Sequence, residues 1–243
     1  MRVPVPGGAI AVEERGSGLP VVFVHGGTGT GEVDWAPVAD RLSQRHRTVV
    51  MDMRGHGSSH DHEGPFGIVR FGLDALHVMD ALGIPRAVLV GFSVGGNALL
   101  TLAARDHRRA LALVTVGSQM RGDAAAAEHI VVGPWPSYLT GLEHEVGTGP
   151  EYWRELRNKL ARDWVQNLAL TRERLATIRC PALICQGTDD PLVTVAEAQE
   201  IAEAIPGGEV AVFEGAGHPV QLDQAEALVR AIEDFVRRRL ALR

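Results

Sequence analysis

The sequence predicts an α/β fold, with a mainly parallel, twisted sheet and helices on both of its faces. Short apolar runs alternate along the chain with segments whose apolar residues recur every three or four positions. The length of 243 residues fits a single domain of this class. The 45% hydrophobic and 22% charged residues are the composition of an ordinary globular protein.

Six apolar runs are predicted to be the parallel strands, because each is a continuous apolar segment bounded by glycine, proline or polar residues. They are 21–24, 48–51, 87–90, 111–116, 181–185 and 210–213. The stretch 9–14 is expected to add an antiparallel strand.

Helical patterns fill the intervals between the strands. Trp35, Val38, Ala39 and Leu42 recur with helical spacing, and Asp34 in front of them is a candidate N-cap. Further helices are expected around 73–80, around 98–102, over 195–205 and over 222–240.

One long stretch in the middle of the chain breaks this alternation. It has no strand-like run, but it holds five of the six tryptophan and tyrosine residues. The segment 151–170 has a helical pattern, whereas two prolines make 133–136 irregular. We interpret residues 119–177 as a helical lid inserted between two parts of one core domain, 1–118 and 178–243.

Charge and composition argue against several classes of protein. A net charge of −6 predicts no broad basic surface for nucleic acid. The start of the chain lacks the apolar core of a secretory signal, and no apolar run approaches the ~20 residues that span a bilayer. Cys180 and Cys185 face opposite ways on one predicted strand, which argues against a structural disulfide. We expect a cytoplasmic protein without nucleic-acid or membrane partners.

The segment 91–95 reads G-F-S-V-G and stands between a predicted strand and a predicted helix. In that context G-x-S-x-G indicates a nucleophile elbow, a turn so tight that the serine is strained and its neighbours need to be almost free of side chains. Ser93 then lies at a helix N-terminus, where the helix dipole favours negative charge. The alternative is a glycine-rich turn with an ordinary serine.

A serine nucleophile needs a base, and the base needs an orienting carboxylate. His218 follows the last predicted strand in a G-A-G-H-P segment, a loop suited to present the ring at the carboxyl edge of the sheet. The other nine histidines lie on helices, in polar stretches or in glycine-rich loops. Asp189 and Asp190 follow the strand run 181–185, and the residues alone do not rank these two carboxylates.

With these residues in place, the chain resembles the α/β-hydrolase family, whose members carry serine, then an acid, then histidine along the chain. The resemblance implies an α/β-hydrolase fold with the triad Ser93, Asp190 and His218, because the G-x-x-D pattern after the strand ends at Asp190. Asp189 stays open as the alternative partner of the histidine.

Other loops extend the resemblance over nearly the whole chain. The segment 25–27, H-G-G, is similar to the family's H-G-x loop, which implies that the N–H groups of Gly27 and Val94 hold an oxyanion. The segment 52–59 is similar to a family loop that is usually architectural, and Asp223 matches a common acidic position. The candidate substrate-binding residues are His25, Phe92, Trp135 and Pro219.

The resemblance implies a serine hydrolase without a cofactor, acting on a small-molecule acyl substrate, a small or medium carboxylic ester or lactone. Similar sequences use the triad for C–C bond hydrolysis, amino-acid ester hydrolysis or haloperoxidase-like chemistry, and Asp34 near the pocket would favour a cationic substrate. A non-catalytic ligand receptor is the alternative from another class. The oligomeric state stays open.

Two rival motifs are weaker. The glycine-rich segment 26–31 resembles a phosphate loop, but Glu32 stands where that motif requires lysine. His56, His60, Asp61 and His62 lack the spacing of a metal site. We therefore expect neither an NTPase nor a metal ion.

Overall fold

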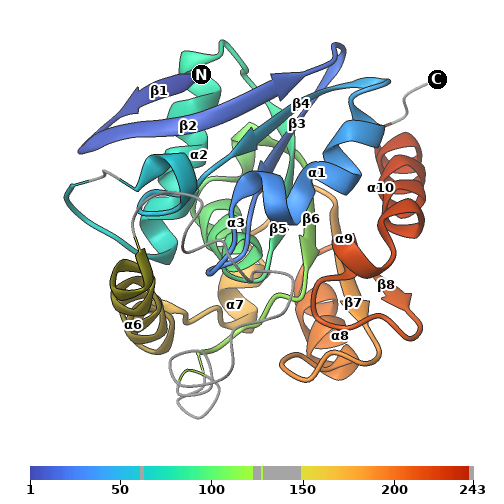
Figure 1. Ribbon diagram of the computed structural model, residues 1–243. Helices are drawn as coiled ribbons and strands as arrows, with labels where there is room; N and C mark the ends of the chain where they lie inside the picture. The colour runs from blue at the N-terminus through green and yellow to red at the C-terminus, as the bar shows by residue number, and fades with distance from the viewer. Residues whose placement is uncertain (61–62, 123–126, 128–148, 241–243) are drawn as a thin grey trace.

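A computed structural model of the protein describes residues 1–60, 63–122, 127 and 149–240. In this part of the chain, strands form one eight-stranded sheet in the order β1-β2-β4-β3-β5-β6-β7-β8. From β4 to β8 all neighbouring strands are parallel, whereas β1 and β2 pair in antiparallel fashion (Figure 1). The strands are β1 Arg2–Val5, β2 Gly8–Arg15, β3 Leu19–Val24, β4 His46–Met51, β5 Ala87–Phe92, β6 Ala110–Val116, β7 Ala182–Gly187 and β8 Glu209–Phe213.

All six predicted parallel strands are confirmed within a few residues, and the predicted antiparallel strand is β2. Strand β1 was not predicted. It is four residues long and contains Pro4, and proline is tolerated in a strand only where, as here at the sheet edge, its missing N–H is not needed.

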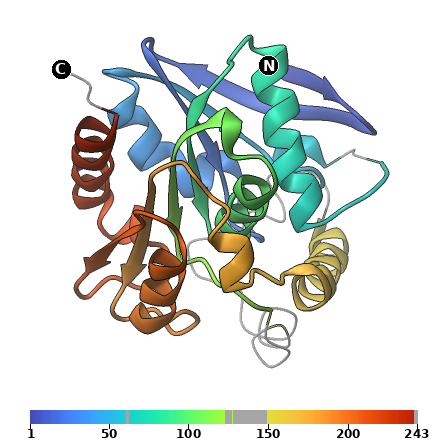
Figure 2. The same cartoon turned by 180° about the vertical axis from the view of Figure 1, so that it is seen from behind.

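Helices cover both faces of the sheet, as the sequence predicts. The helices are α1 Gly31–Leu42, α2 Ile68–Ala81, α3 Val94–Arg105, α6 Gly149–Asn167, α7 Arg172–Leu175, α8 Val195–Ala204, α9 Val220–Asp223 and α10 Ala225–Arg239, and Gly57–Ser59 and His107–Arg109 form short 3-10 helices. Alternate residues of β3 enter different cores: Val21 and Phe23 belong to the core that includes residues of α1 and α10, whereas Val22 and Val24 belong to the core that includes residues of α2 and α3. Figure 2 shows α2 and α3 on the face opposite to α1 and α10.

Two helix predictions need correction. Helix α1 begins three residues before Asp34, and its N-cap is Thr30, whose hydroxyl accepts the Val33 N–H at 3.3 Å. The predicted final helix is divided at Gln224 into α9 and α10, since the φ and ψ of Gln224, −137° and 48°, are not helical. The predicted apolar stripe of α10 is buried as expected.

A buried ion pair joins the loop after β4 to α2. The Arg54 guanidinium donates two hydrogen bonds of 2.5 Å to the Asp74 carboxylate, and the two side chains are 1% and 0% exposed. Arg54 also donates to the carbonyl of Pro65 at 2.7 Å, so this one side chain fixes the segment between β4 and α2.

The predicted lid contributes α6 and α7, while residues 123–126 and 128–148, and with them Trp135, lie outside the described residues. Helix α6 is fastened to the core at two points. The Tyr152 hydroxyl donates to the carbonyl of Gly55 at 2.7 Å, and Asp163 Oδ2 accepts the N–H of Ile68 at 2.7 Å. No described helix has the length and apolar composition needed to cross a membrane.

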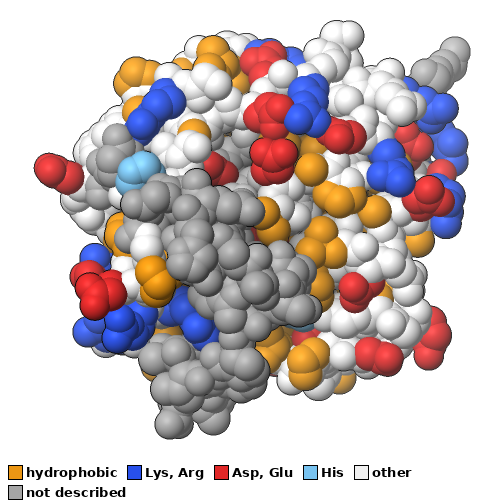
Figure 3. Space-filling view, in the orientation of Figure 1, with side chains coloured by type: hydrophobic (Ala, Val, Ile, Leu, Met, Phe, Trp, Pro, Cys, Tyr) orange, Lys and Arg blue, Asp and Glu red, His pale blue; other side chains and the backbone are white. Residues whose placement is uncertain are grey.

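The surface seen in Figure 3 carries basic and acidic side chains side by side. Exposed ion pairs of the described residues include those of Arg15 with Glu13 and Asp40 and that of Arg41 with Glu226. That face therefore has no broad surface of one charge.

Candidate active site

Ser93 occupies a sharp turn between β5 and α3. Its φ of 50° and ψ of −118° make it the only non-glycine residue with a positive φ in the described ranges. Strand β5 ends at Phe92 and α3 begins at Val94, so the serine stands at the carboxyl edge of the sheet and at the N-terminus of a helix. This is the strained geometry of a nucleophile elbow.

The glycines around the serine leave no room for a side chain. A Cβ on Gly95 would lie 2.3 Å from the carbonyl oxygen of His25, and a Cβ on Gly91 would lie 2.6 Å from the Gly96 nitrogen. A Cβ on Gly96 would lie 2.1 Å from the Ser118 hydroxyl. The close approach of α3 to the sheet therefore depends on these glycines.

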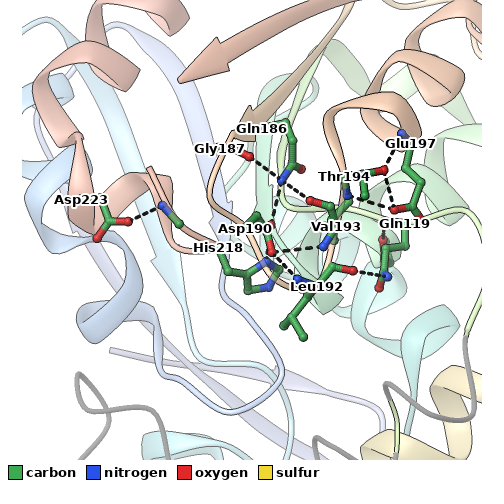
Figure 4. A network of polar contacts seen from close by, with 12 residues as sticks. Gln119, Gln186, Gly187, Asp190, Leu192, Val193, Thr194, Glu197, His218 and Asp223 are labelled. Atoms are coloured by element: carbon green, nitrogen blue, oxygen red, sulfur yellow. Dashed lines mark hydrogen bonds and ion pairs between the residues drawn. The ribbon is translucent and has the colours of Figure 1, made fainter. Parts of the chain in front are cut away.

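His218 and Asp190 meet across two loops of the sheet. His218 Nδ1 lies 2.7 Å from Asp190 Oδ2, and the two side chains are 14% and 0% exposed (Figure 4). Because Nδ1 faces the carboxylate, Nε2 is the nitrogen left for a proton acceptor role.

Asp190 is held by four hydrogen-bond donors in total. The N–H groups of Leu192 and Val193 donate to Oδ1 at 2.7 and 3.1 Å, and the Gln186 side-chain amide donates to Oδ2 at 2.8 Å. Burial alone would raise the pKa of Asp190, but the hydrogen bond and charge of His218, together with these donors, hold it below its ordinary value. The carboxylate is therefore ionised at neutral pH.

Asp189 does not take this position. Its side chain is exposed and accepts a hydrogen bond from the Thr188 hydroxyl at 3.0 Å. Its N–H donates to the carbonyl of Ala216 at 2.9 Å, which joins the loop after β7 to the loop that carries His218. Of the two adjacent carboxylates, the one in contact with the histidine is Asp190.

The imidazole of His218 lies beside the serine turn. Its ring centroid is 4.9 Å from that of Phe92, and a Cβ on Gly117 would lie 2.8 Å from its Cε1 atom. The Ser93 N–H donates to the carbonyl of Val116 at 2.7 Å, so the serine lies next to Gly117. The structure thus brings Ser93, Asp190 and His218 to one edge of the sheet.

The loop 25–27 runs next to the start of α3. A Cβ on Gly27 would lie 2.8 Å from Val94 Cγ2, so the two residues are neighbours. Among the described residues, the backbone N–H groups of Gly27 and Val94 have no acceptor. Two such N–H groups beside a serine turn are suited to bind a negatively charged oxygen.

The His25 side chain holds this loop in place through hydrogen bonds to backbone groups. This corrects the expectation that His25 contacts the substrate. The side chain is 0% exposed. Its Nε2 accepts the Met53 N–H at 2.8 Å, so Nδ1 carries the hydrogen and donates to the carbonyl of Gly26 at 2.6 Å. Burial and the neighbouring His56 lower the pKa of His25 well below its ordinary value, which keeps the ring neutral.

His56 supports the same loop from the segment 52–59. Its Nε2 lies 2.9 Å from the carbonyl oxygen of Gly27 and its Nδ1 lies 3.0 Å from that of Arg54. Burial lowers the pKa of His56 despite these two carbonyl contacts. Asp52 completes the support, because its carboxylate accepts the N–H groups of Gly31 and Ser58 at 2.8 and 2.9 Å.

The remaining candidates for substrate binding lie in different places. Phe92 is 2% exposed and fills the space between His218 and Gly26, so it packs beneath the site instead of forming an open wall. Pro219 is half-buried directly after His218. Trp135 lies outside the described residues.

Helix α6 contributes residues that the sequence did not single out. Leu160 Cδ1 lies 3.5 Å from where a Cβ on Gly27 would be, and Leu156 approaches Gly55 in the same way at 3.4 Å. Asp163 and Tyr152 anchor the helix. A helical spacing in the sequence predicts that these two leucines share one face of the helix. It does not predict which loops they contact, because those loops are far away along the chain.

In the ranges that the structure describes, no group of three or more histidine, cysteine, aspartate or glutamate side chains is arranged to hold a metal ion. Cys180 and Cys185 are both buried and free. His60 places Nδ1 3.0 Å from the carbonyl oxygen of Gly57, while Asp61 and His62 lie outside the described residues.

The sequence pattern of the Alpha/beta hydrolase family matches residues 21–231. The chain belongs to the α/β-hydrolase family. This α/β-hydrolase is 28% identical to 2-hydroxy-6-oxo-2,4-heptadienoate hydrolase of Pseudomonas putida strain F1 over 93% of this chain and 91% of the relative. It is 26% identical to 3-oxoadipate enol-lactonase 1 of Acinetobacter baylyi over 95% of this chain and 94% of the relative.

Solved structures support the same fold. The meta-cleavage product hydrolase CumD of Pseudomonas fluorescens IP01 superimposes with a TM-score of 0.85, covering 98% of this chain and 97% of its own, at 23% sequence identity. The enol-lactonase of Burkholderia xenovorans LB400 gives a TM-score of 0.77 at 24% identity, covering 97% of this chain and 99% of its own. With these relatives named as hydrolases, the protein is an α/β-hydrolase enzyme.

Proposed function

We propose that this α/β-hydrolase cleaves a small or medium carboxylic ester or lactone through an acyl-enzyme on Ser93. The observation that carries the proposal is the contact of 2.7 Å between His218 Nδ1 and Asp190 Oδ2, made where the imidazole lies beside the strained serine turn. A base that is oriented by an ionised carboxylate is what a serine hydroxyl needs to become a nucleophile.

In the acylation step, Ser93 Oγ forms a bond to the carbonyl carbon while its proton passes to His218 Nε2. The carbonyl electron pair moves to oxygen, and the N–H groups of Gly27 and Val94 stabilise the resulting oxyanion. When this intermediate collapses, the bond to the leaving alkoxide breaks and the alkoxide takes the proton from Nε2. An ester releases its alcohol, whereas the alcohol of a lactone stays attached to the acyl chain.

In the deacylation step, water attacks the acyl carbon of the ester to Ser93. His218 Nε2 takes the proton of the water and then returns one to Ser93 Oγ as the carboxylic acid leaves. Asp190 holds the ring with Nε2 toward the serine in both steps and stabilises the imidazolium. No redox change occurs and no cofactor takes part.

We also propose residues 119–177 as the lid over this site, with α6 as one wall. Leu156 and Leu160 lie over the loops of Gly55 and Gly27, and their apolar side chains suit the acyl portion of a substrate. Pro219, which follows His218, is proposed as a further residue in contact with the substrate. A wall of this kind excludes water from the developing charges.

C–C bond hydrolysis is the second candidate reaction. It is favoured by the similarity over 93% of the chain to a hydrolase named for 2-hydroxy-6-oxo-2,4-heptadienoate, together with the TM-score of 0.85 to a meta-cleavage product hydrolase. The same serine, histidine and oxyanion donors serve an attack on a ketone carbonyl, after which the C–C bond breaks and the carbon leaving group, in place of an alkoxide, takes the proton from His218 Nε2.

The deciding experiment measures hydrolysis of p-nitrophenyl acetate and p-nitrophenyl butyrate, of a lactone series and of a 6-oxo-dienoic acid by wild type and Ser93→Ala. We expect ester or lactone turnover in the wild type and loss of nearly all of it in the variant. A fluorophosphonate probe should add its mass to the peptide that holds Ser93. Turnover that survives in Ser93→Ala contradicts the proposal, and turnover of the dienoic acid alone supports the second candidate.

A further inference from the structure

Asp34 is a buried carboxyl group beneath the loop that carries Gly27. It lies in the first turn of α1 and is 1% exposed. Its Oδ2 accepts the Gly26 N–H at 2.7 Å, while Oδ1 is buried without a hydrogen-bond partner in the described part of the chain. Buried polar atoms of this kind are uncommon and call for a functional explanation.

The loop is shaped around this carboxyl group. A Cβ on Gly29 would lie 2.6 Å from Asp34 Oδ1 and 2.7 Å from Oδ2, so only glycine fits there. The next residue of α1, Trp35, donates its indole N–H to the carbonyl of Val24 at 3.1 Å. Two consecutive residues of the helix thus hold the chain on both sides of His25.

Three of the four backbone polar groups of Gly26 and Gly27 have side-chain partners. The Gly26 N–H is held by Asp34, the Gly26 carbonyl by His25, and the Gly27 carbonyl lies 2.9 Å from His56 Nε2. The remaining polar group of these two glycines is the Gly27 N–H, which has no acceptor in the described ranges. Three buried side chains therefore fix the loop and leave free the N–H of Gly27, which neighbours Val94, the residue after the serine.

On the basis of the proposed function, we propose that Asp34 is a positioning residue for the oxyanion site and that its uncharged form supports the reaction. The carboxyl group holds the N–H of Gly26, the residue whose carbonyl belongs to the same peptide as the Gly27 N–H. When it ionises, it places a negative charge on a group that contacts Gly26, one residue before the N–H that is to bind the oxyanion. Charges of the same sign repel more strongly in a buried site than in water, so ionisation of Asp34 opposes the negative charge of the transition state.

The surroundings of the Asp34 carboxyl group favour a change of its protonation state near neutral pH. Burial raises the pKa of Asp34 to about 7, the Gly26 N–H opposes this shift, and Asp52 at the end of β4 adds to it. Two further carboxylates on elements packed against α1 have partners of their own. Asp223 in α9 accepts the Gly217 N–H, and Glu226 in α10 pairs with Arg41.

The test compares Asp34→Asn and Asp34→Ala with Asp40→Asn, which alters an exposed carboxylate of the same helix that pairs with Arg15. The rates of p-nitrophenyl butyrate hydrolysis are divided by the concentration of active sites, which is measured by titration with the fluorophosphonate probe. Asp34→Ala removes the acceptor for Gly26, and we expect kcat to fall about 10- to 100-fold with KM changed less than about twofold, since an oxyanion donor acts in the transition state. Asp34→Asn keeps an acceptor and should restore most of this loss at pH 6.

The pH dependence separates an electrostatic role from a merely structural one. The ratio of kcat for Asp34→Asn to kcat for wild type cancels the titration of His218, which both proteins share. We expect this ratio to rise about tenfold between pH 6 and pH 9, because only the wild type gains a charge. Asp40→Asn should give a flat ratio.

The outcomes distinguish this inference from the proposed function. If the probe does not label Ser93 in the wild type, the proposed function fails, and this inference, which rests on it, falls with it. If Ser93 is labelled but Asp34→Ala keeps the wild-type kcat and the Asp34→Asn ratio is flat, the role of Asp34 alone is wrong. If Asp34→Ala does not fold, the ratio measured with Asp34→Asn decides.

Discussion

Asp163 of α6 caps a different helix: its Oδ2 accepts the N–H of Ile68, the first residue of α2, at 2.7 Å. Gly67, the N-cap residue of α2, has no side chain to do this, and a Cβ there would lie 2.1 Å from Asp163 Oδ1. Helix α6 therefore satisfies the open end of α2, which lies far from it along the chain.

Replacing Asp163 with alanine should lower the free energy of unfolding by about 1 kcal/mol, the usual effect of losing an N-cap acceptor. Asp163→Asn keeps an acceptor and should lose about half of that or less. Urea denaturation of the three proteins measures the difference. Equal stability of wild type and Asp163→Ala would show that water replaces this cap without loss.

The two adjacent carboxylates after β7 should differ sharply in their effect on the reaction. Asp190→Asn should lower kcat by about 10³- to 10⁴-fold, because the oriented tautomer and the stabilised imidazolium are both lost. Asp189→Asn, which alters an exposed side chain, should stay within about twofold of the wild type. Steady-state rates with p-nitrophenyl butyrate check both values, and a large loss in Asp189→Asn would reverse the assignment.

The buried pair of Arg54 and Asp74 should be costly to break. Asp74→Asn leaves a buried guanidinium without its counter-charge and should lower the free energy of unfolding by about 3–5 kcal/mol. The matched control is Asp234→Asn, since Asp234 pairs with Arg237 at the surface of α10 and such pairs contribute at most about 1 kcal/mol. Denaturant midpoints that move equally in both variants would contradict the burial argument.

Asp34 should also make the stability of the protein depend on pH. Its folded pKa of about 7 lies above the unfolded value of 3.8, so its contribution to stability is fully present below pH 3.8 and is lost as the pH rises through about 7. Asp34→Asn removes this dependence. The difference in unfolding free energy between variant and wild type should therefore shift by a few kcal/mol in favour of the variant between pH 4 and pH 8. A constant difference would mean that Asp34 keeps its ordinary pKa in the folded protein.

The parallel strands were predictable because continuous apolar runs between turn residues leave little choice of structure, as in 21–24 and 111–116. The role of Asp34 was not, because a carboxylate just before an apolar helix face looks the same whether it caps the helix or lies beneath a loop. Its partner, Gly26, is eight residues away and contributes only a backbone N–H. A sequence pattern does not reveal a backbone partner, because nearly every residue type carries the same backbone N–H and carbonyl groups.

The geometry also ranks residues that the sequence left equal. Asp189 and Asp190 differ by one position, and which of them contacts His218 depends on how the loop after β7 folds back on Leu192 and Val193. Gln186 illustrates the same limit. It lies in β7, is 0% exposed, and its amide contacts Asp190, yet a glutamine in a strand run carries no signal of such a role.

The two anchors of α6 carry an implication for how this enzyme changes during evolution. Tyr152 and Asp163 bind backbone groups of the core, so these two contacts of the helix do not depend on which residues occupy the positions between them. Leu156 and Leu160 are such positions. On the proposed function, exchanging them for larger or smaller side chains would change the length of acyl chain that the site accepts without replacing Ser93, Asp190 or His218, which makes new specificities accessible by single substitutions.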